Sequence, residues 1–169
     1  MNKKLFILLF SIIVITILLF LLFSNRHKDI KIKKFIDNYN TLIQENLDRN
    51  FNIQASKFSK IEGATYWVKM TDDIELGIMS EGGSTDIDIN NDHVSVVMIR
   101  YSKDTVDYKQ INDYLFYLIK ASNNKIDDSI IKKMIQELRN NEGKKIIDNN
   151  LIISHSKDAY QIDSIGKYS

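Results

Sequence analysis

The chain of 169 residues contains no cysteine and no proline. Without cysteine it has no disulfide framework, no thiol nucleophile, no thiolate zinc site and no lipobox for lipid attachment. It also lacks a P-loop, a G-x-S-x-G nucleophile elbow, an H-E-x-x-H zinc motif and a dinucleotide-binding fingerprint. These absences remove the usual sequence signatures of enzymes, so we predict no catalytic role and no cofactor.

A long apolar segment near the N-terminus, residues 5–23, is the strongest signal in the sequence. Only Ser11 and Thr16 are not strongly apolar there, and no residue is charged. This length suffices to cross the hydrocarbon core of a bilayer as one helix. It exceeds the apolar region of a signal peptide, and residues 24–28 contain no small-x-small cleavage site. We therefore predict an uncleaved transmembrane anchor, preceded by a short tail at residues 1–4.

Basic residues flank both ends of this anchor. Lys3 and Lys4 precede it and favour a cytoplasmic N-terminus, whereas the basic juxtamembrane segment, residues 24–34, would favour the reverse by charge count alone. A short tail before a long domain is typical of a signal anchor, and long domains translocate largely regardless of charge. We therefore expect the domain, residues 35–169, to lie outside the cytoplasm at the cell membrane. Candidate contacts for anionic lipid headgroups are Arg26, Lys28, Lys31, Lys33 and Lys34.

The charge of the chain is split between this membrane flank and the domain. Residues 35–169 carry 16 Lys and Arg against 21 Asp and Glu. Nucleic-acid binding requires a clustered basic face, so the acidic domain argues against a nucleic-acid partner. Asn, Lys, Ile and Asp are abundant, which is typical of AT-rich coding sequences and favours a bacterial source.

Apolar residues recur at helical spacing in three parts of the domain. The first stripe predicts an amphipathic helix over residues 31–49. Asp107 and Asp127 are predicted N-caps of two further helices, and Gly143 is predicted to end the second of them. Short apolar runs from residue 146 onward predict two or three C-terminal strands. The sequence thus predicts an α+β domain with a helical hairpin between two groups of strands.

Residues 66–99 predict a four-stranded antiparallel meander, onto which the first helix packs. Its turns are expected at residues 71–73, 82–83 and 91–92, and they set the register of every strand. One face of this sheet then collects the apolar side chains of Tyr66, Val68, Met70, Ile74, Leu76, Ile78, Ile87, Ile89, Val94, Val96 and Met98.

The second face of the meander is the candidate partner surface. The register places Trp67 opposite Gly77, where an aromatic ring can shield the bare backbone of a strand glycine. It also places Lys69 opposite Glu75 as a charge pair. This face carries more apolar area than a purely solvated surface does, so we expect the helical hairpin or a partner to cover it. Its apolar residues are Trp67, Met79, Val97 and Ile99.

Two acidic arrangements offer alternative functions. Residues 86–92 resemble the first half of an EF-hand loop, but Asn91 replaces its glycine and Val97 replaces its bidentate glutamate. A strand edge that enters a turn explains the run fully, so we predict no metal site. Glu75 and Asp88 can flank a sugar ring if they lie at a suitable separation, which makes a small envelope hydrolase the alternative function.

The expected function follows from the anchor and from the missing catalytic signatures. We expect a single-pass membrane protein whose domain binds a protein partner in the bacterial cell envelope without catalysis. An accessory subunit of an envelope complex and an immunity-type inhibitor both fit this description. Confinement to a membrane surface raises the effective concentration of such a binder for its partner.

Overall fold

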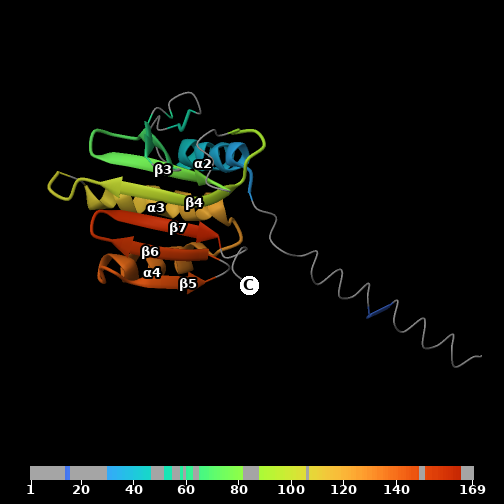
Figure 1. The fold of residues 1–169 in the computed structure, drawn as a ribbon. Helices are drawn as coiled ribbons and strands as arrows, with labels where there is room; N and C mark the ends of the chain where they lie inside the picture. The colour runs from blue at the N-terminus through green and yellow to red at the C-terminus, as the bar shows by residue number, and fades with distance from the viewer. Residues whose placement is uncertain are drawn as a thin grey trace, which may run out of the picture.

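The domain has two layers, with three helices on one side of a seven-stranded antiparallel sheet in the part of the chain that the structure describes (Figure 1). The structure is a computed structural model. It describes residues 14–15, 30–46, 52–54, 58, 60–62, 65–81, 88–105, 107–148 and 151–164.

All strands belong to one sheet with the spatial order β1-β2-β3-β4-β7-β6-β5. The C-terminal strands join the N-terminal ones because β7 pairs with β4. The prediction of an α+β domain with up to three C-terminal strands is confirmed. The sequence analysis did not predict that these strands join the N-terminal strands in a single sheet. The strands are β1 (Lys60–Glu62), β2 (Thr65–Lys69), β3 (Ile74–Ser80), β4 (Val94–Tyr101), β5 (Lys145–Asp148), β6 (Leu151–Ser156) and β7 (Ala159–Ser164).

The helices form where the apolar stripes predict them. The N-caps of the hairpin are confirmed, because the carboxylates of Asp107 and Asp127 each accept the backbone N–H two residues onward. The last helix ends at Arg139, so Gly143, with a φ of 82°, shapes the turn into β5 instead of ending the helix. The helices are α2 (Ile32–Asn46), α3 (Tyr108–Ser122) and α4 (Asp128–Arg139).

The register between β2 and β3 is the predicted one. Trp67 lies opposite Gly77, and Lys69 lies opposite Glu75. The tight turn at residues 71–73 fixes this pairing locally, since the amides of Met70 and Thr71 both donate to the carbonyl oxygen of Ile74.

The predicted third strand of the meander is wrong. Residues 88–92 form a turn, residues 82–87 lie outside the described part of the chain, and β3 pairs directly with β4. The carbonyl oxygens of this turn serve the start of α2. Ile32 N–H donates to Asp92 O and Lys33 N–H donates to Ile89 O, each at 2.9 Å. The first N–H groups of a helix have no intrahelical acceptor. The turn supplies acceptors for two of them in α2, and this contact between distant residues is not visible in the local sequence pattern.

This pairing reverses the two faces of β4. Val97 lies opposite Ile78 and Ile99 lies opposite Leu76, and both are almost fully buried in the helix-covered core. The prediction that Val97 and Ile99 share a face with Trp67 is therefore wrong. Val94 pairs with Ser80 and lies in the core as predicted, but Val96 pairs with Met79, so the register shifts by one residue and this β-bulge reverses the faces of β4 from Val96 onward.

All three helices pack on the same face of the sheet. In Figure 1, α3 and α4 lie behind the strands from β4 to β5, and α2 lies on that side at the β3 end. One apolar cluster joins the buried residues of the helices to those of the sheet. Of the two covers expected for the face of Trp67, the helical hairpin is consequently wrong for the described residues, and the partner remains a prediction.

Among the described residues, no helix is both long and apolar enough to cross a membrane. The predicted anchor, residues 5–23, falls outside the described residues except for Val14 and Ile15, which are helical. The anchor and the localisation that depends on it remain predictions.

Candidate functional site

The outer face of the sheet is the face opposite the three helices, and no described helix covers it (Figure 1). Strand alternation assigns its side chains, because residues paired across the ladder share a face. The residues at the centre of this outer face are Thr65, Trp67, Lys69, Glu75, Met79, Val96, Met98, Arg100, Ile152, Ser154, Gln161 and Asp163.

Trp67 is the most buried large side chain of the outer face, with 7% exposure. A Cβ atom on Gly77 would lie only 2.8 Å from the indole Cζ3, so the ring lies against the bare backbone of that glycine. The Arg100 guanidinium stacks 4.0 Å from the ring centroid and also pairs with Glu75. The structure thus brings Trp67 into a packed cluster with a cation on its open side.

An apolar patch extends across the sheet from this cluster. Met79 and Val96 face each other across β3 and β4, and Met98 lies beside Gln161 of β7. These side chains are half-buried, although no described helix covers them. Of the four predicted surface residues, Trp67 and Met79 lie on this face, whereas Val97 and Ile99 lie in the core. Val96 and Met98 replace them.

Three of the predicted headgroup contacts lie at the start of α2. Lys31 forms an isolated bridge with His93 in the sheet, and Lys33 pairs with Asp37 at 3.0 Å. Lys31, Lys33 and Lys34 are all exposed. Arg26 and Lys28 lie outside the described residues, so the role of this segment in lipid binding remains a prediction.

The structure does not bring the two carboxylates of the alternative hydrolase together. Glu75 lies near the start of β3, and Asp88 lies in the turn beyond the end of β3. The five residue steps from Glu75 to Ser80 alone span about 16 Å at 3.3 Å per residue, beyond the carboxylate separation of glycosidases. Glu75 is engaged by Arg100.

The acidic run at residues 86–92 is a hydrogen-bonded turn in its described part. The carboxylate of Asp88 accepts from the backbone N–H of Asn90 and from the side-chain amide of Asn91. These bonds hold the pKa of Asp88 below its usual range, with the Asn91 bond as the largest cause. Asp92 accepts from the N–H of Asp88. Among the described residues, no group of three or more His, Asp or Glu side chains is placed to hold a metal ion.

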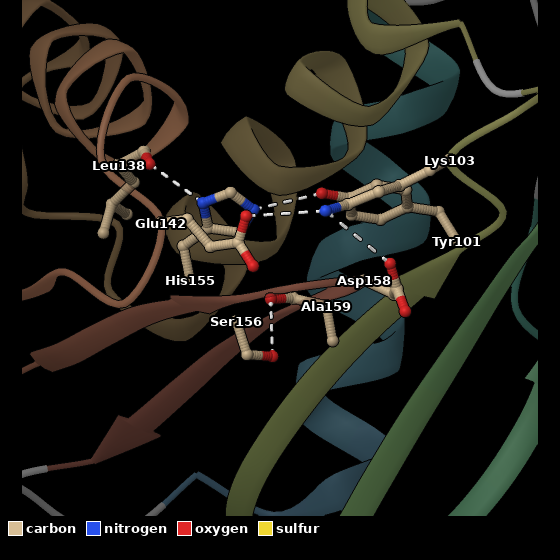
Figure 2. Close-up of polar contacts among 8 residues, drawn as sticks. All are labelled: Tyr101, Lys103, Leu138, Glu142, His155, Ser156, Asp158 and Ala159. Atoms are coloured by element: carbon tan, nitrogen blue, oxygen red, sulfur yellow. Dashed lines mark hydrogen bonds and ion pairs between the residues drawn. The ribbon is translucent and has the colours of Figure 1, made fainter.

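A buried histidine, His155, connects α4 to the sheet. Figure 2 shows His155 of β6 between Leu138 of α4 and Tyr101 of β4. The Nδ1 atom lies 2.9 Å from the carbonyl oxygen of Leu138. Since a carbonyl only accepts, Nδ1 carries a proton, and in the neutral ring Nε2 accepts the hydroxyl of Tyr101 at 3.1 Å.

Aromatic rings close this histidine off from solvent. The imidazole stacks on Tyr160 with centroids 4.3 Å apart, and Tyr160 stacks on Tyr101. Burial raises the pKa of Tyr101 well above its usual value, so its hydroxyl stays protonated and able to donate. Ion pairs from Lys103 to Glu142 and Asp158 lie across the neighbouring turns (Figure 2). His155 is 8% exposed, and we assign the cluster a structural role.

The tight turn between β6 and β7 was the signal that could have revealed this cluster. Ser156 pairs with Ala159 across a two-residue loop. That loop places His155 opposite Tyr160 by the same counting that gave the β2–β3 register.

A groove of about 620 Å³ lies on the other side of the molecule, among the helices. Phe116 and Tyr117 meet edge to face in it, with centroids 5.1 Å apart. Lys120 on its wall is held by Asp128 at 2.6 Å. The groove is lined by aromatic rings, amides and paired charges. It is therefore an alternative partner-binding surface to the outer face.

Comparisons with protein-family models, with curated proteins and with solved structures found no match to this chain.

Proposed function

We propose that the protein is a single-pass, membrane-anchored binding protein of the bacterial cell envelope, and that it captures a protein partner on the outer face. The observation that supports this proposal is the one-sided cover of the sheet. The helices bury one face, and the other presents Met79, Val96 and Met98 beside the Trp67–Arg100 cluster. Uncovered apolar surface on a folded domain marks interaction sites, and methionine adapts to varied partners.

The chemistry of the outer face fits a protein partner. Its half-buried apolar side chains are bordered by charged and amide groups, which resembles the core and rim of protein interfaces. The Arg100–Glu75 pair and Gln161 lie close to the apolar patch and can supply polar contacts. Both an accessory subunit and an immunity-type inhibitor would use such a surface. The alternative hydrolase has less support, because Glu75 and Asp88 lie too far apart to act as a pair.

The test is cross-linking of the tagged full-length chain in its native membranes, followed by identification of the captured protein. Met98→Lys places a charge in the centre of the outer face and should abolish capture. Tyr117→Lys places the same charge in the helical groove and serves as the matched control, with capture retained.

The opposite pattern would contradict the proposal. Capture that survives Met98→Lys but is lost with Tyr117→Lys would assign partner binding to the groove. Circular dichroism of both variants checks that each remains folded.

A further inference from the structure

Among the described residues, the edge formed by β5 has backbone groups without a partner strand. β5 pairs with β6 on one side, and no described strand pairs with its other side. His155 exchanges backbone hydrogen bonds with Gly143 and Lys144 just before β5. Because antiparallel bonding alternates along a strand, Ile146 is directed toward β6, whereas the N–H and C=O groups of Lys145 and Ile147 point away from the sheet.

Two exposed apolar side chains lie near this same edge, one on each side of the sheet. Among the described residues from 30 onward, Ile130 and Ile147 are the exposed large hydrophobic residues, at 38% and 67%. Ile147 belongs to β5. Ile130 belongs to α4, which packs over β5 and β6 (Figure 1). Lys144 donates to Glu137, which turns the Glu137 side of α4 toward the edge, and Ile130 lies two helical turns earlier on that side.

We propose that the β5 edge pairs with the β5 edge of a second copy of this chain. The two strands run antiparallel about a two-fold axis that passes through Ile146. Lys145 then faces Ile147 of the second copy, and Ile147 faces its Lys145. All four residues direct their free N–H and C=O groups across the axis, so both outward-facing pairs of each copy are satisfied.

The outward-directed groups of β5 are arranged symmetrically about Ile146, so the edge is complementary to itself and favours a second copy as the occupant. A shift by one residue would set outward-directed groups against inward-directed ones, and a shift by two would leave one outward-directed residue of β5 without a partner within the strand. With Ile146 opposite Ile146 of the second copy, the helix-covered faces of the two sheets lie on the same side of the joined sheet. The aliphatic stem of Lys145 can then cover the exposed Ile147 of the other copy.

The position of α4 agrees with this pairing. Neighbouring strands lie about 4.8 Å apart, and α4 lies over β5 and β6, roughly one strand spacing from the axis. The α4 helices of the two copies would therefore lie about 10 Å apart, which is within the packing distance of helices. Ile130 would be covered in the contact between them.

The test uses the full-length chain in membranes, because its lack of cysteine makes every introduced thiol unique. Ile146→Cys places two thiols directly opposite each other, with Cα atoms about 4.5 Å apart. A mild oxidant should convert this variant to a disulfide-linked dimer. Ile147→Cys is the matched control. Its two Cα atoms would lie about 8–9 Å apart, beyond the reach of a disulfide, so it should stay monomeric although residue 147 is the more exposed.

A second measurement does not depend on the half-buried position 146. Co-expression of one tagged chain with Lys145→Cys and a differently tagged chain with Ile147→Cys should give a mixed disulfide, because these residues face each other across the axis. Both positions are exposed, so neither substitution disturbs the core. Cross-linking of Ile146→Cys and of the mixed pair supports the proposal. Equal or faster cross-linking of Ile147→Cys alone, or no mixed disulfide, would overturn it.

Discussion

Replacement of Gly77 by alanine is the sharpest test of the Trp67 cluster. The added Cβ atom would lie 2.8 Å and 2.9 Å from two indole carbons and 2.9 Å from the methyl group of Thr65. Ordinary contacts begin near 3.4 Å, so the indole has to move by about half an ångström, against the Arg100 guanidinium that stacks on its other side. Overpacking of this kind costs about 1–3 kcal/mol.

The expected net effect is smaller than the steric cost. Alanine in a strand regains about 0.5–1 kcal/mol relative to glycine. We therefore expect Gly77→Ala to lower the free energy of unfolding by about 1–2 kcal/mol. Trp67→Ala alone should cost about 2–3 kcal/mol, below the usual range for buried aromatic residues, because one side of the ring faces the outer surface.

The double variant distinguishes this contact from a general sensitivity of the strand. Without the indole, the alanine at position 77 meets only the Thr65 methyl group, so Gly77→Ala should become nearly neutral in the Trp67→Ala background. The coupling free energy should be about 1–2 kcal/mol. Denaturant unfolding in detergent is followed for all four chains by far-ultraviolet circular dichroism. Tryptophan fluorescence is unsuitable, because Trp67 is the single tryptophan and two of the chains lack it. Additive costs would refute the packing of Trp67 on Gly77.

Three further predictions concern the buried histidine, the pH dependence of stability and the anchor. His155→Leu should lower the free energy of unfolding by about 1–3 kcal/mol in chemical denaturation, because it removes the two buried hydrogen bonds that join His155 to the Leu138 carbonyl and to the Tyr101 hydroxyl; an unchanged midpoint would contradict this role. The hydroxyl and amide of Ser129 hold the pKa of Asp127 below its usual range, so its carboxylate stabilises the fold above about pH 4 and this contribution is lost as the pH falls through the lowered pKa. Asp127→Asn keeps the helix cap, and its stability should therefore approach that of the wild type only in acid; a constant difference across the titration would show that ionisation is irrelevant. The intact mass of protein purified from membranes should include residues 5–23, and a soluble species that begins near residue 25 would refute the uncleaved anchor.

The parts of the fold that follow from local spacing could be predicted from the sequence. The three amphipathic stripes, the caps at Asp107 and Asp127 and the β2–β3 register all depend on residues close together in the chain. The error in the third strand of the meander has a long-range cause at its described residues, 88–90. Ile87 and Ile89 alternate with acids as a strand would, but the turn carbonyls at residues 89 and 92 accept the first amides of α2.

The candidate surface was only half predicted for the same reason. Trp67 and Met79 lie on strands whose pairing is fixed by the short turn at residues 71–73, so their face was correct. Val97 and Ile99 follow the register shift at the start of β4, which the local spacing does not reveal, and they were assigned to the wrong face. The β5 edge could not be found from the sequence, because a long-range contact decides which end of the β5–β6–β7 meander joins β4. β7 makes that contact, which leaves β5 at the edge of the sheet.

The hydrogen bonds at the start of the domain connect the two proposals. Val94 N–H donates to Ile30 O, and Ile32 N–H donates to Asp92 O, so the chain is fixed to the sheet from residue 30 onward. Only residues 24–29 separate this point from the predicted anchor, and six residues span at most about 20 Å. A domain held this close to a membrane meets membrane-bound partners within a thin layer. The effective concentration there is high, so small interfaces bind more strongly than in free solution. A four-residue strand edge and a modest apolar patch are weak surfaces in dilute solution, and tethering to a membrane is the condition under which such surfaces bind.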